Sequence, residues 1–161
     1  MSQTITRSFV PCLFGKIAIT ESGDKNAPAV IFSHSILSNS MMWDEQLTLL
    51  ANSGWRAIAI DTRGHGQTTA TQPPYTLAEL GLDVIAVMDY LKIDKAHFVG
   101  LSLGGMIGFG LGINHHSRLL SLCICDARAD APPPVFKQWS ERMEVAKQEG
   151  CKALALPTAE R

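Results

Sequence analysis

The stretch AHFVGLSLGGMIG, residues Ala96–Gly108, places one serine among four glycines. The apolar run Ala96–Val99 is typical of a short buried strand, and the residues from about Leu103 onward fit a helix. Glycine weakens strands and helices alike, so its concentration around Ser102 indicates a local steric requirement. The sequence therefore predicts a strand, a tight turn and a helix in immediate succession, with Ser102 in the turn.

The turn itself spells G-x-S-x-G, from Gly100 to Gly104. In this arrangement the serine occupies a strained bend and lifts its hydroxyl at the carboxyl end of a sheet. Small residues at both glycine positions relieve the collision between the incoming strand and the outgoing helix. The helix begins beside the serine, so its free N–H groups and positive dipole end face the reacting atoms. We therefore predict that Ser102 is a nucleophile and that the Leu103 N–H binds a developing oxyanion.

Two other interpretations of the glycines have to be weighed. Gly104, Gly108 and Gly112 recur every four residues, so they share one helix face that approaches the sheet closely whether or not the serine reacts. A phosphate-binding loop fits less well, because the chain has no G-x-x-x-x-G-K-[ST] and no G-x-G opens this helix. A nucleotide-binding α/β domain is disfavoured for the same reason.

The remaining sequence alternates between short apolar runs and longer helical stretches. Runs expected to form strands are Gly15–Gly23, Ala29–Phe32, Ala57–Ile60, Ala96–Val99 and Leu119–Cys125. Most are continuously apolar, which is typical of parallel strands covered on both faces. Helices are expected within 40–54 and 76–93, the second opening with a capping box from Thr76 to Glu79. This alternation predicts an α/β fold with a doubly wound, mostly parallel sheet.

Composition excludes several classes of protein. The 161 residues fit one domain, 46% are hydrophobic and 18% charged, and the net charge is −1 without a basic block. Nucleic acid is therefore not expected as a partner. No apolar run approaches the ~18 residues that span a bilayer, and the polar start, broken by Pro11, does not fit a secretory signal. We expect a cytoplasmic protein with no membrane partner.

The four cysteines match neither a zinc pattern nor a C-x-x-C redox pair. Cys123 and Cys125 alternate within an apolar run and are expected to share one strand face as small buried hydrophobes. No metal site and no cofactor are expected.

Two further segments follow predicted strands at the same rim. FSHSILSNSMMW leaves the strand Ala29–Phe32, and an acyl-transfer site needs a second backbone donor from this crossover, for which Ile36 is the candidate. His34 is interpreted as a loop or packing residue and not as a base. DTRGHGQT, Asp61–Thr68, is interpreted as structural, with Asp61 and Arg63 capping and pairing locally and the histidine as a loop residue.

Together the stretches HSILSNSMMW, DTRGHG and VGLSLGGMIG resemble the α/β-hydrolase superfamily. WDEQL, IDTRGHG, PYTLAELGLDVIAVMDYLKIDKAHFVGLSLGG and GCKALALPTAER resemble the 3-oxoadipate enol-lactonase group within it. The resemblance implies an α/β-hydrolase fold lacking its C-terminal strands, with residues 1–127 as the N-terminal part of the core and 128–161 as the start of a helical cap. It implies Ser102 as nucleophile, backbone N–H groups of Ile36 and Leu103 as oxyanion hole, and cofactor-free hydrolysis of an enol-lactone in aromatic catabolism.

The same resemblance implies that the acid and the histidine of the triad follow beyond Arg161. His97, His115 and His116 lie about 16–20 Å along the chain from the serine, leaving His34 and His65 as weak stand-ins. Asp126, at the end of a strand, is a weak candidate for the acid. We therefore expect either one piece of a cleaved or split enzyme or a truncated form of little activity.

The apolar strand containing Leu122–Cys125 would then form an exposed sheet edge, which is an aggregation hazard. We expect a second polypeptide segment, or a second copy, to cover it. The rival functions are a non-catalytic module that binds a small ligand, and a perhydrolase or C–C hydrolase on the same fold.

Overall fold

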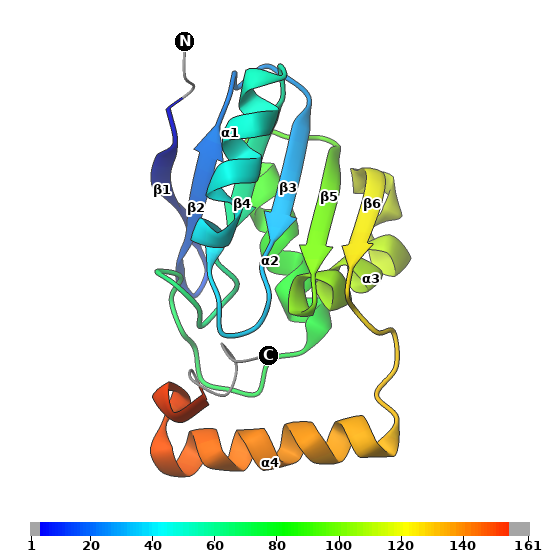
Figure 1. Cartoon of the computed structure of the whole chain (residues 1–161). Coiled ribbons are helices and arrows are strands. Elements are labelled where there is room, and N and C mark those ends of the chain that lie inside the picture. Colours follow the sequence, from blue (N-terminus) through cyan, green and yellow to red (C-terminus); the bar gives the residue numbers. More distant parts are fainter. Residues whose placement is uncertain (1–3, 155–161) are drawn as a thin grey trace. The chain divides into compact units, whose positions relative to one another are not determined.

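The computed structural model describes residues 4–154 and divides into two compact units, Met1–Ala127 and Arg128–Arg161 (Figure 1). Residues 155–161, the last part of the predicted cap and of the resemblance to the enol-lactonases, lie outside the described residues. Each unit is described separately below.

The first unit is built on one six-stranded sheet with the order β1-β2-β4-β3-β5-β6 (Figure 1). The strands are β1 (Thr6–Cys12), β2 (Gly15–Ser22), β3 (Ala29–Ser33), β4 (Arg56–Ile60), β5 (Ala96–Leu101) and β6 (Leu119–Cys125). β1 and β2 pair antiparallel, as do β2 and β4, whereas β4, β3, β5 and β6 run parallel. The predicted mostly parallel sheet is confirmed.

Helices cover both faces of this sheet (Figure 1). A short 3₁₀ turn (Ser40–Trp43) leads into α1 (Asp44–Asn52), which buries Leu47 against the core containing Val30 and Phe32. The other face packs against α2 (Leu77–Tyr90) and α3 (Leu103–Asn114). A further 3₁₀ turn, His116–Arg118, joins α3 to β6. β3 and β4 are buried along their whole length, which explains the continuously apolar runs Ala29–Phe32 and Ala57–Ile60 within them.

β1 was not among the strands predicted from the sequence, where its segment is described only as a polar start broken by Pro11. Proline cannot donate to a strand ladder and is therefore confined to edge positions, and β1 is an edge strand. Pro11 pairs with Lys16 across the β1–β2 hairpin. A proline at an edge marks the end of a sheet and not the absence of a strand.

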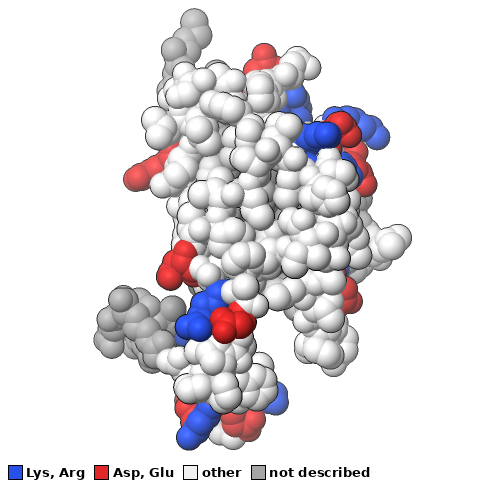
Figure 2. Space-filling view, turned by 90° about the vertical axis from the view of Figure 1, so that its right-hand side faces the viewer, with Lys and Arg blue, Asp and Glu red and all other residues white. Residues whose placement is uncertain are grey.

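The prediction that Cys123 and Cys125 are buried was wrong. They share a strand face, as expected, but Cys123 is exposed and Cys125 is only partly buried. The reason is the place of β6 at the other edge of the sheet, where Leu120 and Leu122 are also exposed. Figure 2, which views the molecule from the side of β6 and α3, shows a face of the first unit with few charged side chains.

The second unit consists of α4 (Pro133–Glu149) and a 3₁₀ turn at Cys151–Leu154. Pro133 and Pro134 occupy the first turn of α4, where a proline loses no helical hydrogen bond. α4 lies in the region expected to start a helical cap, yet none of its residues is buried, and Phe136 and Met143 are exposed. Its assignment to a cap stays a prediction.

Within residues 4–154 no helix combines the length and apolar character needed to cross a bilayer.

The capping box predicted at the start of α2 is present. The Thr76 hydroxyl accepts from the Glu79 N–H at 3.2 Å, and the Glu79 carboxylate accepts from the Thr76 N–H at 2.7 Å.

Thr76→Ala removes this cap, so we expect the free energy of unfolding to fall by about 1 kcal/mol in urea titrations. Thr48→Ala in α1 is the matched control, since that threonine lies inside a helix and its hydroxyl donates to the Asp44 carbonyl four residues earlier. Equal losses in both variants would show that the cap contributes nothing specific.

Candidate active site

Ser102 lies in the turn between β5 and α3, with φ 52° and ψ −110°. A residue with a Cβ rarely adopts a positive φ, and holding it in that conformation costs about 1–3 kcal/mol. Two backbone bonds hold the turn: the Ser102 N–H donates to the Cys125 carbonyl at 2.9 Å, and the Met106 N–H donates to the Ser102 carbonyl at 2.9 Å. The surrounding structure therefore fixes a strained serine at the point where strand becomes helix.

The glycines beside Ser102 are required by backbone contact. A Cβ at Gly100 would overlap the Gly104 carbonyl, and a Cβ at Gly104 would overlap the Ser33 carbonyl on the adjacent strand β3. Gly105 and Gly108 also face β6, where a Cβ would lie 3.1 Å and 2.9 Å from Ile124 side-chain atoms. The close approach of α3 to the sheet and the bend at Ser102 thus share one cause, the lack of side chains on this helix face.

The candidate oxyanion loop follows β3. Ile36 lies half-buried in a turn closed by the Ser38 N–H and the Ser35 carbonyl at 3.3 Å, and Leu37 takes φ 60°. The loop is tied to α3 because the Gly104 N–H donates to the His34 carbonyl at 3.2 Å. Leu103 opens α3, where the first N–H groups have no carbonyl partner within the helix. The two predicted donors, the N–H groups of Ile36 and Leu103, therefore belong to segments that are hydrogen-bonded to each other.

His34 is fully buried and both of its ring nitrogens are engaged. Nδ1 lies 2.7 Å from the Ser35 carbonyl, which can only accept, so Nδ1 carries the proton. Nε2 then accepts from the Thr62 N–H at 2.9 Å. The neutral imidazole therefore links the loop after β3 to the loop after β4 through two hydrogen bonds. This geometry agrees with the interpretation of His34 as a packing residue.

Burial lowers the pKa of His34, and the neighbouring His65, whose ring centroid is 5.2 Å away, lowers it further. Hydrogen bonding to Ser35 and the charge of Asp61 oppose this shift. The neutral form is therefore favoured, which matches the acceptor role of Nε2.

The loop after β4 is structural, as interpreted from DTRGHGQT, but one pairing differs. Asp61 is buried and its carboxylate accepts from the Ser40 N–H at 2.7 Å and the Gln67 N–H at 2.8 Å. Arg63 does not pair locally: it makes two hydrogen bonds with Asp83 of α2, at 3.0 and 2.7 Å. A partner on a helix twenty residues away is set by the tertiary fold, which sequence spacing does not reveal.

The other histidines and the candidate acid have separate positions. His97, on β5, lies 2.7 Å from the Ser121 hydroxyl on β6, and His115 and His116 follow the end of α3. Asp126 directly follows β6 with φ 42°, next to Cys125, whose carbonyl binds the Ser102 amide. The Cys125 carbonyl is the part of the turn that sequence reasoning missed, because a backbone acceptor leaves no signal in residue type.

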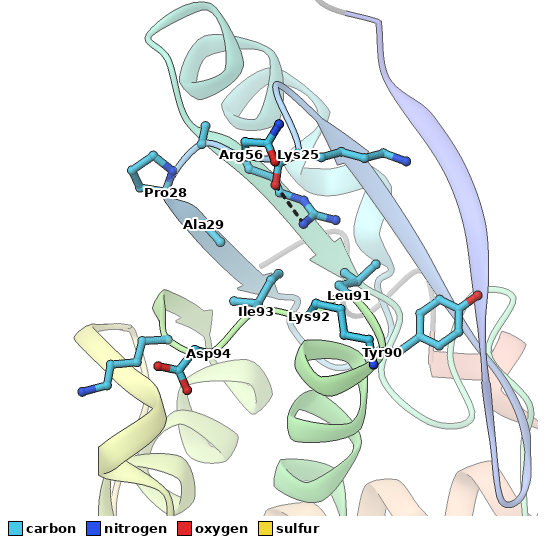
Figure 3. A pocket seen from close by; sticks show the side chains of 12 residues that line it. Lys25, Pro28, Ala29, Arg56, Tyr90, Leu91, Lys92, Ile93 and Asp94 are labelled. Carbon is cyan, nitrogen blue, oxygen red and sulfur yellow. Dashed lines mark hydrogen bonds between the residues drawn. The ribbon is translucent and has the colours of Figure 1, made fainter.

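A large depression of about 720 Å³ lies elsewhere, lined by Lys25, Arg56 and Lys92 among others (Figure 3). It includes the first residues of β3 and β4 and therefore lies at the amino ends of the parallel strands. Ligands of open α/β sheets bind at the carboxyl ends, which is where Ser102 lies. Arg56 is already paired there with Glu21, at 3.0 Å.

The fold and the strained serine at a strand–helix turn define an α/β hydrolase, and the chain belongs to this family: a family model for the alpha/beta hydrolase fold matches residues 28–155. The 3-oxoadipate enol-lactonase 1 of Acinetobacter baylyi is 35% identical over 144 residues, which cover 88% of this chain and 52% of that protein. The resemblance inferred from the motifs is thereby confirmed.

Solved structures agree. The enol-lactonase from Burkholderia xenovorans LB400 superposes with a TM-score of 0.88 at 33% identity, covering 96% of this chain and 59% of that one. A hydrolase from Pseudomonas aeruginosa gives a TM-score of 0.87 at 35% identity, covering 95% and 57%. The chain therefore spans about half the length of the relatives that it matches.

Because of the backbone contacts at the Ser102 turn, alanine substitutions at two glycines of α3 should have opposite effects on stability. Gly104→Ala must displace the backbone of β3, so we expect a loss of about 1–3 kcal/mol in the free energy of unfolding. A Cβ added at Gly110 meets no atom within 4 Å. Because alanine loses less backbone freedom on folding than glycine does, Gly110→Ala should stabilise the helix by about 0.5–1 kcal/mol. Urea unfolding of both variants measures the difference, and a well-tolerated alanine at position 104 would contradict the account.

His34 predicts an acid-sensitive fold. Its pKa in the folded state lies below the ordinary value near 6.5, so the unfolded chain binds the proton more readily. The stability that neutral His34 contributes to the fold is fully present above about pH 6.5. It is lost as the pH falls toward the folded-state pKa, by at most about 1.4 kcal/mol per pH unit. Unfolding titrations between pH 8 and pH 5 should show the slope in the native chain and a smaller one in His34→Gln. His116→Gln is the control, and an unchanged slope in His34→Gln would refute the assignment.

Proposed function

We propose that this chain carries the nucleophile of a serine hydrolase that acts on a carboxylic ester or lactone through an acyl-enzyme at Ser102. The observation that supports it most is the φ of 52° at a serine between the carboxyl end of β5 and the first turn of α3. Strained backbone persists where the surrounding structure enforces it, and it clusters at catalytic positions. Because relatives include a 3-oxoadipate enol-lactonase, an enol-lactone is the first substrate to test.

In the proposed reaction a base takes the proton of the Ser102 hydroxyl while its Oγ attacks the carbonyl carbon, and the N–H groups of Leu103 and Ile36 stabilise the negative charge on the carbonyl oxygen. The C–O bond of the ester or lactone then breaks, and the base returns the proton to the leaving oxygen. In the second half of the reaction the base takes a proton from a water molecule, whose oxygen attacks the acyl carbon. The bond from that carbon to Oγ breaks, Ser102 regains its proton, and the carboxylic acid is released. The tie between the Gly104 amide and the His34 carbonyl would keep the two donors at a fixed separation.

Each half-reaction needs a base, because a serine hydroxyl is a poor nucleophile unaided. His34 is unsuited to this role, since both ring nitrogens are hydrogen-bonded within the fold. We propose that a second polypeptide segment supplies the acid and the histidine and pairs with the edge strand β6 near Leu122–Cys125. The exposed apolar side chains of Leu120 and Leu122 and the scarcity of charge on this face support such a contact (Figure 2).

The engagement of His34 also favours one alternative, a module of this fold that binds a small ester or lactone without turning it over. A perhydrolase or a C–C hydrolase would use the same serine turn at Ser102. Substrate turnover separates these from an esterase, because the reacting bond differs while Ser102 does not.

The test is covalent labelling of Ser102. The chain is isolated with the polypeptides bound to it, treated with a fluorophosphonate, and the adduct is mapped by tandem mass spectrometry. We expect the label on Ser102 and its loss in Ser102→Ala, while Ser121→Ala labels like the native chain. Turnover is then assayed with an enol-lactone and a p-nitrophenyl ester.

Two outcomes would count against the proposal. Absence of label from the complete assembly would remove Ser102 as nucleophile. A ligand retained by the assembly without turnover of either substrate would favour the non-catalytic module.

A further inference from the structure

The thiols of Cys123 and Cys125 form a pair on the edge strand β6. Their Sγ atoms are 3.8 Å apart, because residues two apart in a strand project from the same face. Their partners in the register, Val99 and Leu101 of β5, pack with the core beneath α1. Cys123 is exposed and Cys125 partly buried, so solvent reaches the pair.

The separation of the two sulfurs matches two ligands of one tetrahedral ion. With Zn–S bonds of about 2.3 Å, two thiolates on a tetrahedral ion lie about 3.8 Å apart. A disulfide fits less well, because residues two apart in a strand have Cα atoms about 6.6 Å apart, near the upper limit for a disulfide. An ion can therefore be bound without bending the strand, whereas a disulfide would require the strand to shorten.

We propose that Cys123 and Cys125 together bind one thiophilic divalent cation of the Zn²⁺ and Cd²⁺ class. Within residues 4–154 no group of three or more His, Cys, Asp or Glu side chains is placed to hold a metal. The ion would therefore take two protein thiolates and fill its other positions with water or small anions, unlike a closed structural zinc site.

Binding forms two sulfur–metal bonds and releases the thiol protons to solvent, with no change of oxidation state. A strand added at the edge would pair with backbone groups in the plane of the sheet, whereas the thiols project from its face. The site is therefore compatible with the proposed covering segment and does not depend on hydrolase activity.

The site also lies next to the serine turn. The carbonyl of Cys125 accepts the hydrogen bond from the Ser102 N–H at 2.9 Å. An ion on the Cys125 thiolate would change the electronic environment of that peptide, so the amide resonance of Ser102 becomes a local reporter of occupancy.

The test titrates the full-length chain with CdCl₂ in a phosphine reductant and follows thiolate-to-cadmium charge-transfer absorbance, with ZnCl₂ as competitor. We expect one ion per chain and a shift of the Ser102 amide resonance. Cys123→Ser and Cys125→Ser should each weaken binding at least about tenfold, since losing even an outer-shell partner costs about 10–100-fold. Cys151→Ser and Cys12→Ser are the matched controls and should bind like the native chain.

The proposal is overturned if no ion binds, if Cys123→Ser binds as tightly as the native chain, or if the Ser102 amide does not respond. In a parallel sample kept in air without the reductant, a mass decrease of two hydrogens together with no metal uptake would identify a disulfide formed by oxygen and would also overturn the proposal. Amide spectra of both serine variants in the absence of metal confirm that β6 is folded, so a loss of binding reports the missing ligand.

Discussion

The close contact between the backbone of α3 and the sheet is the constraint on which the rest of this structure depends. A Cβ at Gly104 would overlap the Ser33 carbonyl of β3, and a Cβ at Gly100 would overlap the Gly104 carbonyl, so neither site has room for a side chain. Because the helix starts this close to the strand that precedes it, the connecting residue is forced to φ 52°. The same contact brings the Gly104 amide to the His34 carbonyl and so connects the loop after β3 to the turn at Ser102.

Much of this could be predicted from residue order. Continuous apolar runs identified the parallel strands, and the G-x-S-x-G pattern between a strand and a helix identified the turn, since glycine at both positions has a steric cause that is local in sequence. What failed was long-range or depended on position in the sheet. Arg63 pairs with Asp83 across twenty residues, and Cys123 is exposed on the edge strand β6. Periodicity describes which side chains share a face, but it does not say whether anything covers that face.

The polar groups at the two ends of the parallel strands are used differently, and this difference explains why the candidate active site lies at the carboxyl ends. At the amino ends of the strands the buried cation Arg56 is paired with Glu21, so its charge is already satisfied. At the carboxyl ends the sheet offers amides at the start of α3 and in the loop after β3, held by a neutral His34 and a fully bonded Asp61. Polar groups there are used to fix backbone positions, which is what an oxyanion site requires. Relatives of about twice this length share the fold over the part that matches this chain.

The most direct measurement of the central claim is the backbone conformation of Ser102 in solution, by NMR on the isotopically labelled chain. The account predicts a strong intraresidue amide–Hα Overhauser effect, as positive φ produces, together with a scalar coupling through the hydrogen bond from the Ser102 nitrogen to the Cys125 carbonyl carbon. A Ser102 with the weak effect of an ordinary helical residue, and without that coupling, would contradict the strained turn and the hydrolase proposal built on it.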